Sequence, residues 1–279
     1  MDYCNRELVL QAVVLPLLLP RWAMLVTLYD QADEISGQFN IAKRIPGKEE
    51  FYETLRYFCV QLEKHGIKIT LGTKVSYNQM NQEGDAVDKW IVAAGVDPRD
   101  PKITGMENNP KVLSYIDVLR HKAPVGKRVA LVGAGGIGFD VSEYLLHYDG
   151  KDKTAKEVSR EDFWKEWGID PEMNDRGGLL PADKQEHHEP PRQLYLLQRK
   201  KGKVGKNLGK TTGWIHRAAL KKGNVEMING AKYERIHENG HLHISQDGKK
   251  RVLEVDNVII CAGQVEHRDL EISAKQAKC

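Results

Sequence analysis

The stretch "RVALVGAGGIGFD" (residues 128–140) decides the fold of this 279-residue chain. Its apolar residues lead into a G-x-G-x-x-G turn that opens a helix-compatible run. In dinucleotide-binding folds the first glycine makes a tight turn, the second lets a pyrophosphate approach, and the third packs helix on strand. The strand–turn–helix context therefore predicts a nucleotide site. Its candidate residues are Gly133, Gly135, Gly136, Ile137 and Gly138. The alternative is a glycine turn that only packs a helix against a strand.

The fingerprint lies in the middle of the chain, so the residues before it need their own explanation. Apolar patterning predicts strands over 24–30, 67–71 and 89–95, and a helix between 48 and 65. "WIVAAGVDPR" (90–99) is echoed by "VIICAGQVEHR" (258–268). Each is an apolar run that ends in Ala-Gly and continues into a loop with an arginine. This echo predicts two nucleotide-type domains joined by crossing strands.

The second half of the chain carries further local signals. Ser114 and Asp117 have the spacing of a helix capping box, and Asp247-Gly248 is a hairpin turn signal between two strand-like runs. We also expect the fingerprint helix to run to about His147, followed by a polar insertion with one short helix at 150–190. Strands are expected at 193–199 and 257–263, with a helix at 211–222 between them.

The strand at 193–199 indicates which nucleotide is preferred. NAD sites place an acid at the end of this strand, whereas here it ends in Arg199 and Lys200. Cations at this point match the 2′-phosphate of NADP, so the sequence favours NADPH over NADH. The alternative is a solvated basic loop. A nucleic-acid patch is not favoured, because the loop lacks interleaved aromatic residues and the formal net charge is only +3.

Composition excludes several other classes. Four scattered cysteines form no C-x-x-C pair, which argues against a disulfide framework, zinc site or iron–sulfur ligand set and favours a reducing cytoplasm. The apolar run 8–20 is too short and too proline-interrupted for a membrane span, and its flanks do not fit a signal peptide. No hydrolase or zincin motif occurs, so the catalytic residues remain unassigned. His187 and His188 are expected to be exposed, and His216 is either a cofactor contact or a packing histidine.

Three longer stretches carry a family resemblance. "LYDQADEISGQFNIAKRIPGKEEFYETLRY", "KVLSYIDVLRHKAPVGKRVALVGAGGIGFD" and "LLQRKKGKVGKNLGKTTGWIHR" resemble the bacterial NADPH-dependent 2,4-dienoyl-CoA reductases, relatives of trimethylamine dehydrogenase and the old yellow enzymes. The resemblance covers about residues 24–268. It implies a hydride path from NADPH to FAD, then through an iron–sulfur cluster to an FMN barrel that reduces a dienoyl-CoA in fatty-acid β-oxidation. This chain resembles the FAD/NADPH portion alone.

The same resemblance implies FAD contacts at Asp30, Gly37, Gln38 and Val75. Ser36 stands where the family's glycine pair begins. The family's first glycine turn would precede residue 24, where "VVLPLLLPRWAML" (13–25) stands instead, and its flavin-closing Gly-Asp segment would follow the last residue, Cys279. We therefore expect a truncated chain in which the contacts to the FAD pyrophosphate are missing.

These observations together predict an α/β fold, with a Rossmann-like NADPH-binding domain at 109–256 inserted in a partial FAD-type domain at 24–108 and 257–279. Residues 1–23 would be an atypical apolar N-terminus. The expected function is that of an NADPH-binding flavoprotein oxidoreductase fragment that cannot reduce dienoyl-CoA alone. Two alternatives stay open: a non-catalytic nucleotide-binding remnant, and a subunit that needs a separate barrel and iron–sulfur chain.

Overall fold

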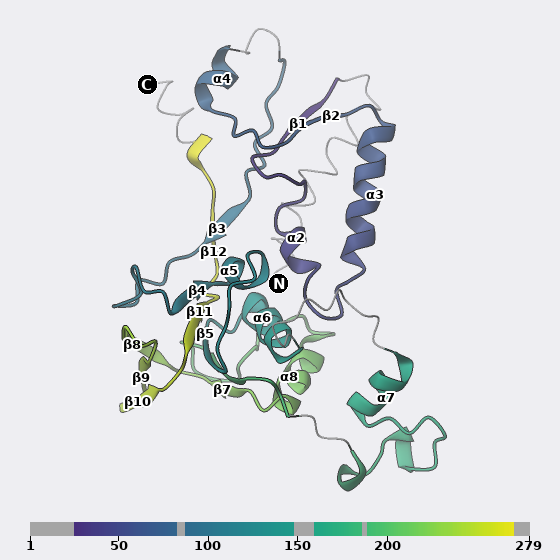
Figure 1. Cartoon of the computed structure of the whole chain (residues 1–279), viewed down its shortest axis with the longest axis vertical. Helices are drawn as coiled ribbons and strands as arrows, with labels where there is room; N and C mark the ends of the chain where they lie inside the picture. Colours follow the sequence, from purple (N-terminus) through teal and green to yellow (C-terminus); the bar gives the residue numbers. More distant parts are fainter. Residues whose placement is uncertain (1–24, 83–86, 148–158, 186–188, 271–279) are drawn as a thin grey trace.

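A computed structural model describes residues 25–82, 87–147, 159–185 and 189–270. The described chain forms two units (Figure 1). The sheet unit comprises residues 99–263 and the outer unit comprises residues 25–95, and the segments 96–98 and 264–270 join them. The arrangement is the α/β fold with a Rossmann-like parallel sheet that the sequence predicts.

The sheet unit is built on five parallel strands in the order β4-β11-β5-β6-β7. Their bounds are β4 Val112–Ser114, β5 Arg128–Val132, β6 Gln193–Leu197, β7 Glu226–Ile228 and β11 Asn257–Ile260. The helices of this unit are α5 Tyr115–Leu119, α6 Gly136–His147, α7 Arg160–Trp167 and α8 Gly213–Lys222, with short 3-10 turns at Arg176–Gly178 and Ala182–Lys184.

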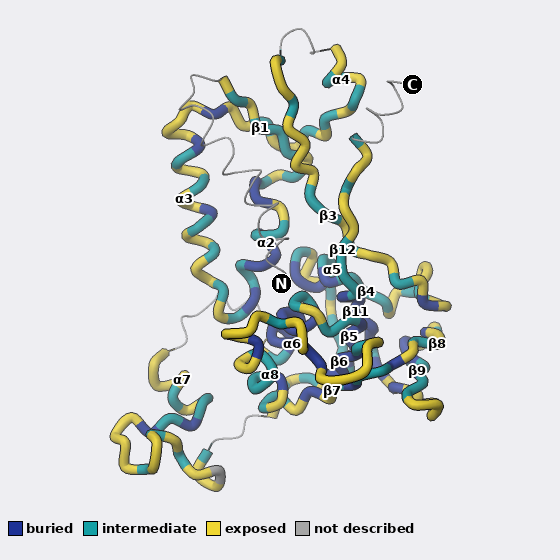
Figure 2. The backbone as a smooth tube through the Cα atoms, turned by 180° about the vertical axis from the view of Figure 1, so that it is seen from behind, coloured by how far each residue is buried: buried dark blue, intermediate teal, exposed yellow. Residues whose placement is uncertain are grey.

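The period-two alternation of strand side chains separates two cores on the two faces of this sheet. Val129 and Leu131 of β5 pack with α5, α6 and α8. Ala130 and Val132 face the opposite way and pack with a three-stranded antiparallel sheet. That sheet consists of β8 Lys232–Ile236, β9 Leu242–Gln246 and β10 Lys249–Leu253. The parallel strands are thus covered on both faces, and most of the deeply buried residues lie here (Figure 2).

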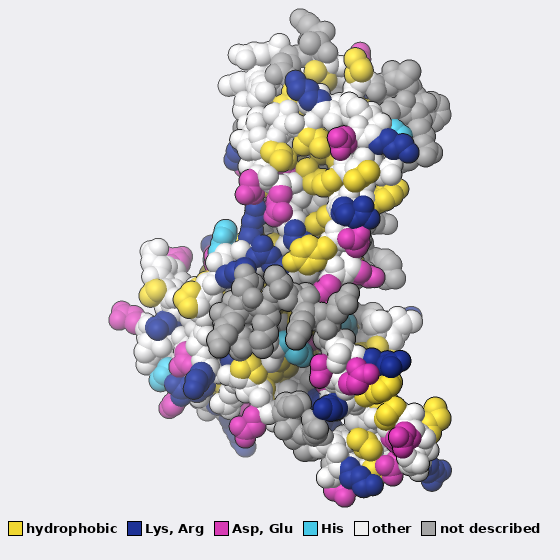
Figure 3. Space-filling view, turned by 45° about the vertical axis from the view of Figure 1, so that its right-hand side comes forward, with side chains coloured by type: hydrophobic (Ala, Val, Ile, Leu, Met, Phe, Trp, Pro, Cys, Tyr) yellow, Lys and Arg dark blue, Asp and Glu magenta, His cyan; other side chains and the backbone are white. Residues whose placement is uncertain are grey.

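The outer unit is much thinner. Its elements are β1 Thr27–Tyr29, α2 Phe39–Ala42, α3 Phe51–Lys64, β2 Lys68–Thr70 and α4 Tyr77–Gln82. β1 and β2 make a parallel two-stranded sheet, and Leu28 of this sheet packs near Ile35, Leu62 and Ile67. Figure 3 shows hydrophobic side chains at the surface of this unit, where Tyr52, Tyr57 and Val60 of α3 are exposed.

Two crossing strands join the units. β3 (Val96–Pro98) and β12 (Gln264–Glu266) pair antiparallel, with Val265 opposite Asp97. The capping box is also confirmed, because the Ser114 hydroxyl accepts from the Asp117 N–H at 3.1 Å while Asp117 accepts from the Ser114 N–H at 2.7 Å. The hairpin turn at Asp247-Gly248 has the two positive φ angles, 49° and 82°, that such a turn requires.

Three expectations need correction. Residues 89–95 do not form a strand, because no described strand pairs with them and Ile91 and Val92 are exposed. Residues 257–260, expected in the FAD-type domain, form β11 between β4 and β5. Ile103, also expected in that domain, is buried in the core between the two sheets of the sheet unit. The boundaries of the sheet unit therefore lie near residues 98 and 264, at the paired crossing strands.

Candidate functional site

The fingerprint turn requires glycine at two positions for packing. Gly133 follows β5 with φ of +114°, and a Cβ there would lie 2.3 Å from the Cys261 carbonyl oxygen. A Cβ on Gly138 would lie 1.9 Å from the Gly133 carbonyl oxygen. Real Cβ atoms do not approach oxygen so closely, so Gly138 lets α6 pack on the turn after β5, and Gly133 lets this turn pack on the residues that follow β11.

Gly135 has a different surrounding. A Cβ at this position would meet nothing within 4 Å, so open space lies next to the turn. Gly136 and Ile137 begin α6, and the first N–H groups of a helix have no acceptor within the helix. Open space, backbone donors and the positive end of the helix dipole suit a pyrophosphate.

The loop after β6 lies next to this turn. β5 and β6 are parallel neighbours with Val132 opposite Leu197, and the Gly133 N–H donates to the Leu197 carbonyl at 3.0 Å. Arg199 and Lys200 follow within three residues, and both are exposed. The structure thus brings the two expected cations to the edge of the sheet where the fingerprint turn lies.

Three contacts fix the shape of this loop. Lys201 Nζ donates to Asp247 Oδ1 of the β9–β10 turn at 2.7 Å, and this hydrogen bond raises the pKa of Lys201. The Gly230 N–H donates to the Lys200 carbonyl at 3.1 Å. Tyr233 donates to the Leu197 carbonyl at 3.4 Å, and burial raises the pKa of Tyr233 to about 12. Lys201 is engaged in this anchor, which leaves Arg199 and Lys200 facing solvent.

The helix α6 carries two buried carboxylates that the sequence analysis did not single out. Lys48 Nζ, from the loop before α3, donates to Asp140 Oδ1 at 2.5 Å. Glu143 Oε1 lies 2.7 Å from His216 Nδ1 on α8. The sequence signal for them was a pair of acids three residues apart, Asp140 and Glu143, on an otherwise apolar helix. Because buried acids are paired in folded proteins, this pattern indicates that each acid has a partner.

His216 therefore lies beside the fingerprint helix, a position that fits a cofactor contact and a packing histidine alike. The hydrogen bond to Glu143 raises the pKa of His216, and burial opposes this shift. Asp140 raises the pKa further, whereas Lys48 lowers it. Lys48, Asp140, Glu143 and His216 thus form one charge network that spans the outer unit, α6 and α8.

The acid at the end of β1 lies beside the loop that follows β2. The Asp30 carbonyl accepts from the Thr73 N–H at 2.9 Å, and Val75 follows two residues later. Asp30 Oδ1 accepts from the Ala32 N–H at 2.9 Å. The structure thus brings together Asp30 and the segment with Val75, which the resemblance assigns to the adenosine end of FAD.

The turn with Gly37 and Gln38 lies at the opposite end of the outer unit, next to the sheet unit. The Tyr115 hydroxyl, which lies near the Gln38 side chain, accepts from Gln264 Nε2 at 3.0 Å. Burial raises the pKa of Tyr115. Tyr115 begins α5 and Gln264 begins β12, so this turn lies near the crossing strands, whereas the β1–β2 sheet lies farther from the sheet unit (Figure 1).

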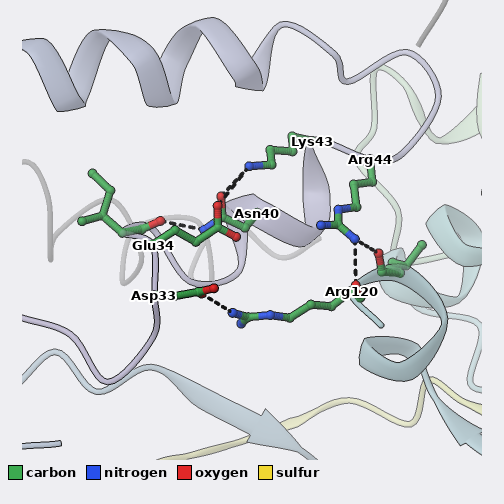
Figure 4. A network of polar contacts seen from close by, with 8 residues as sticks. Asp33, Glu34, Asn40, Lys43, Arg44 and Arg120 are labelled. Carbon is green, nitrogen blue, oxygen red and sulfur yellow. Dashed lines mark hydrogen bonds and ion pairs between the residues drawn. The ribbon is translucent and has the colours of Figure 1, made fainter. Parts of the chain in front are cut away.

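A polar network around α2 fastens the two units together (Figure 4). Arg44 donates to the carbonyls of Leu119 and Arg120 at 2.6 and 2.9 Å, which caps the end of α5. Arg120 donates to Asp33 at 3.4 Å. On the other side of α2, Lys43 donates to Asn40 Oδ1 at 2.7 Å and lies 3.5 Å from Glu34.

The described residues contain no group of three or more His, Cys, Asp or Glu side chains arranged to hold a metal ion. None of the helices within the described ranges is long and apolar enough to cross a membrane. His187 and His188 lie outside these ranges.

Comparison with known proteins gives one family match. Residues 19–279 match the family described as "Pyridine nucleotide-disulphide oxidoreductase". Among curated proteins, a metal reductase of Desulforamulus reducens is 24% identical over 248 residues, which are 88% of this chain and 35% of that protein. An NADH oxidase of Thermoanaerobacter brockii is 29% identical over 129 residues, 45% of this chain and 20% of the oxidase.

Solved structures share the fold. A 2-naphthoyl-CoA reductase in complex with 2-naphthoyl-CoA matches 94% of this chain and 32% of its own, with a TM-score of 0.70 and 22% identity. An engineered water-forming NADPH oxidase bound to NADPH matches 95% of this chain and 54% of its own, with a TM-score of 0.55 and 18% identity. The chain thus spans about a third of the length of the metal reductase and of the naphthoyl-CoA reductase.

Proposed function

Because the chain belongs to the pyridine nucleotide-disulphide oxidoreductase family, we propose that it binds NADPH and acts as the pyridine-nucleotide half of a flavoprotein oxidoreductase. One observation carries this proposal. The open space at Gly135 lies at the start of α6, and Arg199 and Lys200 follow the neighbouring strand at the same sheet edge. A diphosphate and a 2′-phosphate on one ligand would find donors at both places.

Each group has a defined role in this proposal. The N–H groups at Gly136 and Ile137 bind the pyrophosphate, and Gly135 lets it approach. Arg199 and Lys200 bind the 2′-phosphate, while the anchor between Lys201 and Asp247 holds their loop in place. NADPH is thereby preferred over NADH, because NADH lacks the phosphate that these cations pair with.

FAD fits the outer unit in two places. Asp30 retains one carboxylate oxygen beyond its bond to Ala32, which suits a ribose hydroxyl. A Cβ on Gly37 would meet nothing within 4 Å, so open space lies beside the turn that would hold the flavin, with Gln38 next to it. When both cofactors are bound, NADPH supplies a hydride that FAD accepts. The Lys48–Asp140 pair and the Arg44 cap hold the two units in contact for that transfer.

The finer proposal follows the family resemblance. We propose that the parent reaction is NADPH-dependent reduction of a 2,4-dienoyl-CoA in the cytoplasm. The barrel and the iron–sulfur cluster of such an enzyme would reside on a separate chain or on another part of a longer protein. This chain spans only about a third of the length of the metal reductase and of the naphthoyl-CoA reductase, which supports this view. The sheet unit would be the NADPH domain and the outer unit part of the FAD domain.

One observation favours a second candidate, a nucleotide-binding unit without electron transfer. The described outer unit has only a two-stranded sheet, whereas the sheet unit has a complete parallel sheet with two covered faces. NADPH binding would then persist without flavin.

A titration with NADPH and NADH tests the proposal, with the visible spectrum recorded first. We expect tighter binding of NADPH than of NADH, and a flavin band that NADPH bleaches. The double variant Arg199→Ala/Lys200→Ala should weaken NADPH binding by about 100-fold and leave NADH binding nearly unchanged. Lys232→Ala, an exposed lysine on β8, serves as the matched control. Equal binding of both nucleotides would refute the NADPH preference. Selective NADPH binding by a colourless protein would favour the second candidate.

A further inference from the structure

Two histidines, His237 and His243, lie in contact on the antiparallel hairpin that β8 and β9 form. Their ring centroids are 4.4 Å apart, and the angle between the ring planes is 43°. His237 directly follows β8, and His243 is the second residue of β9. The hairpin lies on the side of the sheet unit away from α7 (Figure 1), and neither histidine belongs to the candidate nucleotide site.

The backbone of the hairpin holds the two rings in position. Leu242, which precedes His243, is buried in the core between the two sheets of the sheet unit. The His237 N–H donates to the His241 carbonyl at 3.0 Å, and the His237 carbonyl accepts from Asn109 Nδ2 at 2.9 Å. Because side chains alternate along a strand, His243 lies on the face opposite to Leu242. Both histidines are partly exposed, so solvent ions can reach the pair.

The separation of the two rings suits imidazoles that bind one metal ion side by side. With metal–nitrogen bonds of about 2.0–2.1 Å, two rings bound at a right angle have centroids about 4.5 Å apart, and two rings bound at the tetrahedral angle have centroids about 5.2 Å apart. The observed separation of 4.4 Å is closer to the first value. Coordination at right angles by nitrogen and oxygen is typical of Cu²⁺ and Ni²⁺.

The surroundings of His243 keep its imidazole available as a ligand. Burial lowers the pKa of His243, and the nearby His237, Arg235 and His241 lower it further. Only an unprotonated imidazole binds a metal ion, so this shift favours the binding form. The charge of Arg235 also repels a cation, and no described His, Cys, Asp or Glu side chain extends the pair to a group of three. We therefore expect an open site, completed by water, that binds more weakly than a closed metal centre.

We propose that His237 and His243 together bind a divalent transition-metal ion of the Cu²⁺ or Ni²⁺ type, through one ring nitrogen each. This inference goes beyond the proposed function and does not depend on it, because the hairpin contributes no residue to the NADPH or FAD contacts. The bound ion links the end of β8 to β9. It stabilises the folded protein, since the unfolded chain does not hold the two rings together.

Substitution by phenylalanine tests the pair, because it keeps an aromatic ring for packing and removes the nitrogen ligands. Binding of Ni²⁺ to the full chain is measured by calorimetric titration, with Mg²⁺ as a comparison ion that prefers oxygen ligands. We expect His237→Phe and His243→Phe each to weaken a Ni²⁺ site of the wild type by about 10–100-fold, since one ligand of the chelate is lost. His241→Phe, in the same hairpin, is the matched control and should retain the site.

Thermal unfolding provides a second measurement. Ni²⁺ should raise the melting temperature of the wild type and of His241→Phe, and it should leave that of His237→Phe and His243→Phe unchanged. Unchanged Ni²⁺ affinity in either His237→Phe or His243→Phe overturns the two-histidine site, and so does an equal loss in His241→Phe. Equal affinity of the wild type for Mg²⁺ and Ni²⁺ overturns it as well. Glutamine replaces phenylalanine in any variant that fails to fold, with the same expected losses.

Discussion

The two units of the molecule differ in how completely they bury their sheets. The sheet unit buries both faces of a five-stranded parallel sheet, one against helices and one against a second sheet. The outer unit has two strands of three residues each, and its small core centres on Ile35, Leu62 and Ile67. The buried polar side-chain atoms without a partner in the described residues, Ser36 Oγ and Trp90 Nε1, both lie in the outer unit.

The two units should therefore differ in their stability and in how far that stability depends on a bound ligand. A small unit buries a smaller fraction of its surface, so bound ligands and contacts with neighbours contribute more of its stability. We therefore expect the sheet unit to be stable without cofactor and the outer unit to depend on the interface network and on a ligand. Substitutions in each unit and at their interface test this expectation.

Gly138→Ala should lower the unfolding free energy of the sheet unit more than any other single substitution proposed for it. The new Cβ would lie 1.9 Å from the Gly133 carbonyl oxygen and 3.3 Å from Leu196 Cδ1, so α6 must move away from β5. We expect a loss of more than about 4 kcal/mol in unfolding free energy and loss of NADPH binding. Urea denaturation and a nucleotide titration measure both effects.

Gly135→Ala is the matched control, because its Cβ would meet nothing within 4 Å. It should leave stability nearly unchanged and weaken NADPH binding alone. Equal destabilisation by both substitutions would contradict the distinction between a packing glycine and a ligand-facing glycine.

Leucine-to-alanine changes in the two cores test whether the units unfold separately. Leu131 of β5 and Leu62 of α3 are both fully buried, and each truncation should cost about 3 kcal/mol. We expect two transitions in calorimetry. Leu62→Ala should lower only the first of them and Leu131→Ala the second. A single transition that shifts equally in both variants would mean that the units unfold as one.

Lys48→Met tests the contact between the units. It leaves Asp140 buried without its cation, so we expect a loss of about 2 kcal/mol in unfolding free energy, concentrated in the transition of the outer unit. Adding Asp140→Leu should restore most of the loss, since replacing both charges removes the unpaired group. Arg56→Ala, which breaks an exposed ion pair with Glu53, is the control and should change little. A double variant no more stable than Lys48→Met would refute the pairing.

The His216–Glu143 pair should make a smaller contribution that depends on pH. The pKa of His216 is raised in the folded protein, chiefly by the bond to Glu143. Its stabilisation is therefore complete below the ordinary histidine pKa of about 6.5 and is lost as the pH rises through the raised value. Relative to wild type, His216→Gln should lose about 1 kcal/mol at acidic pH and less at alkaline pH. Urea denaturation across this range provides the check, and a difference independent of pH would argue against a charged pair.

Local signals in the sequence predicted local structure well. The glycine turn at 133–138, the Ser114 capping box and the Asp247-Gly248 hairpin each depend on neighbouring residues, and the structure confirms these elements. The strand expected at 89–95 was wrong because a strand also requires a paired neighbour, which periodicity does not reveal.

The contacts of the candidate site that the sequence did not predict share one physical cause. Lys48 and Asp140 are 92 residues apart, Glu143 and His216 are 73 apart, and Lys201 and Asp247 are 46 apart. Such pairs follow from tertiary packing, so one sequence indicates only that a buried acid needs some partner. The cofactor roles of Arg199, Lys200, Asp30, Gly37, Gln38 and Val75 stay predictions until binding is measured.

The pairing of β3 with β12 has a consequence for synthesis on the ribosome. Arg99 and its partner Gln264 are separated by 165 residues, so β3 emerges long before the strand that it pairs with. At about 5–20 residues per second, the nascent chain waits roughly 8–33 s for this partner. The sheet unit is translated entirely within that interval. The strand β3, although made before the sheet unit, can therefore pair with β12 only after the sheet unit has left the exit tunnel.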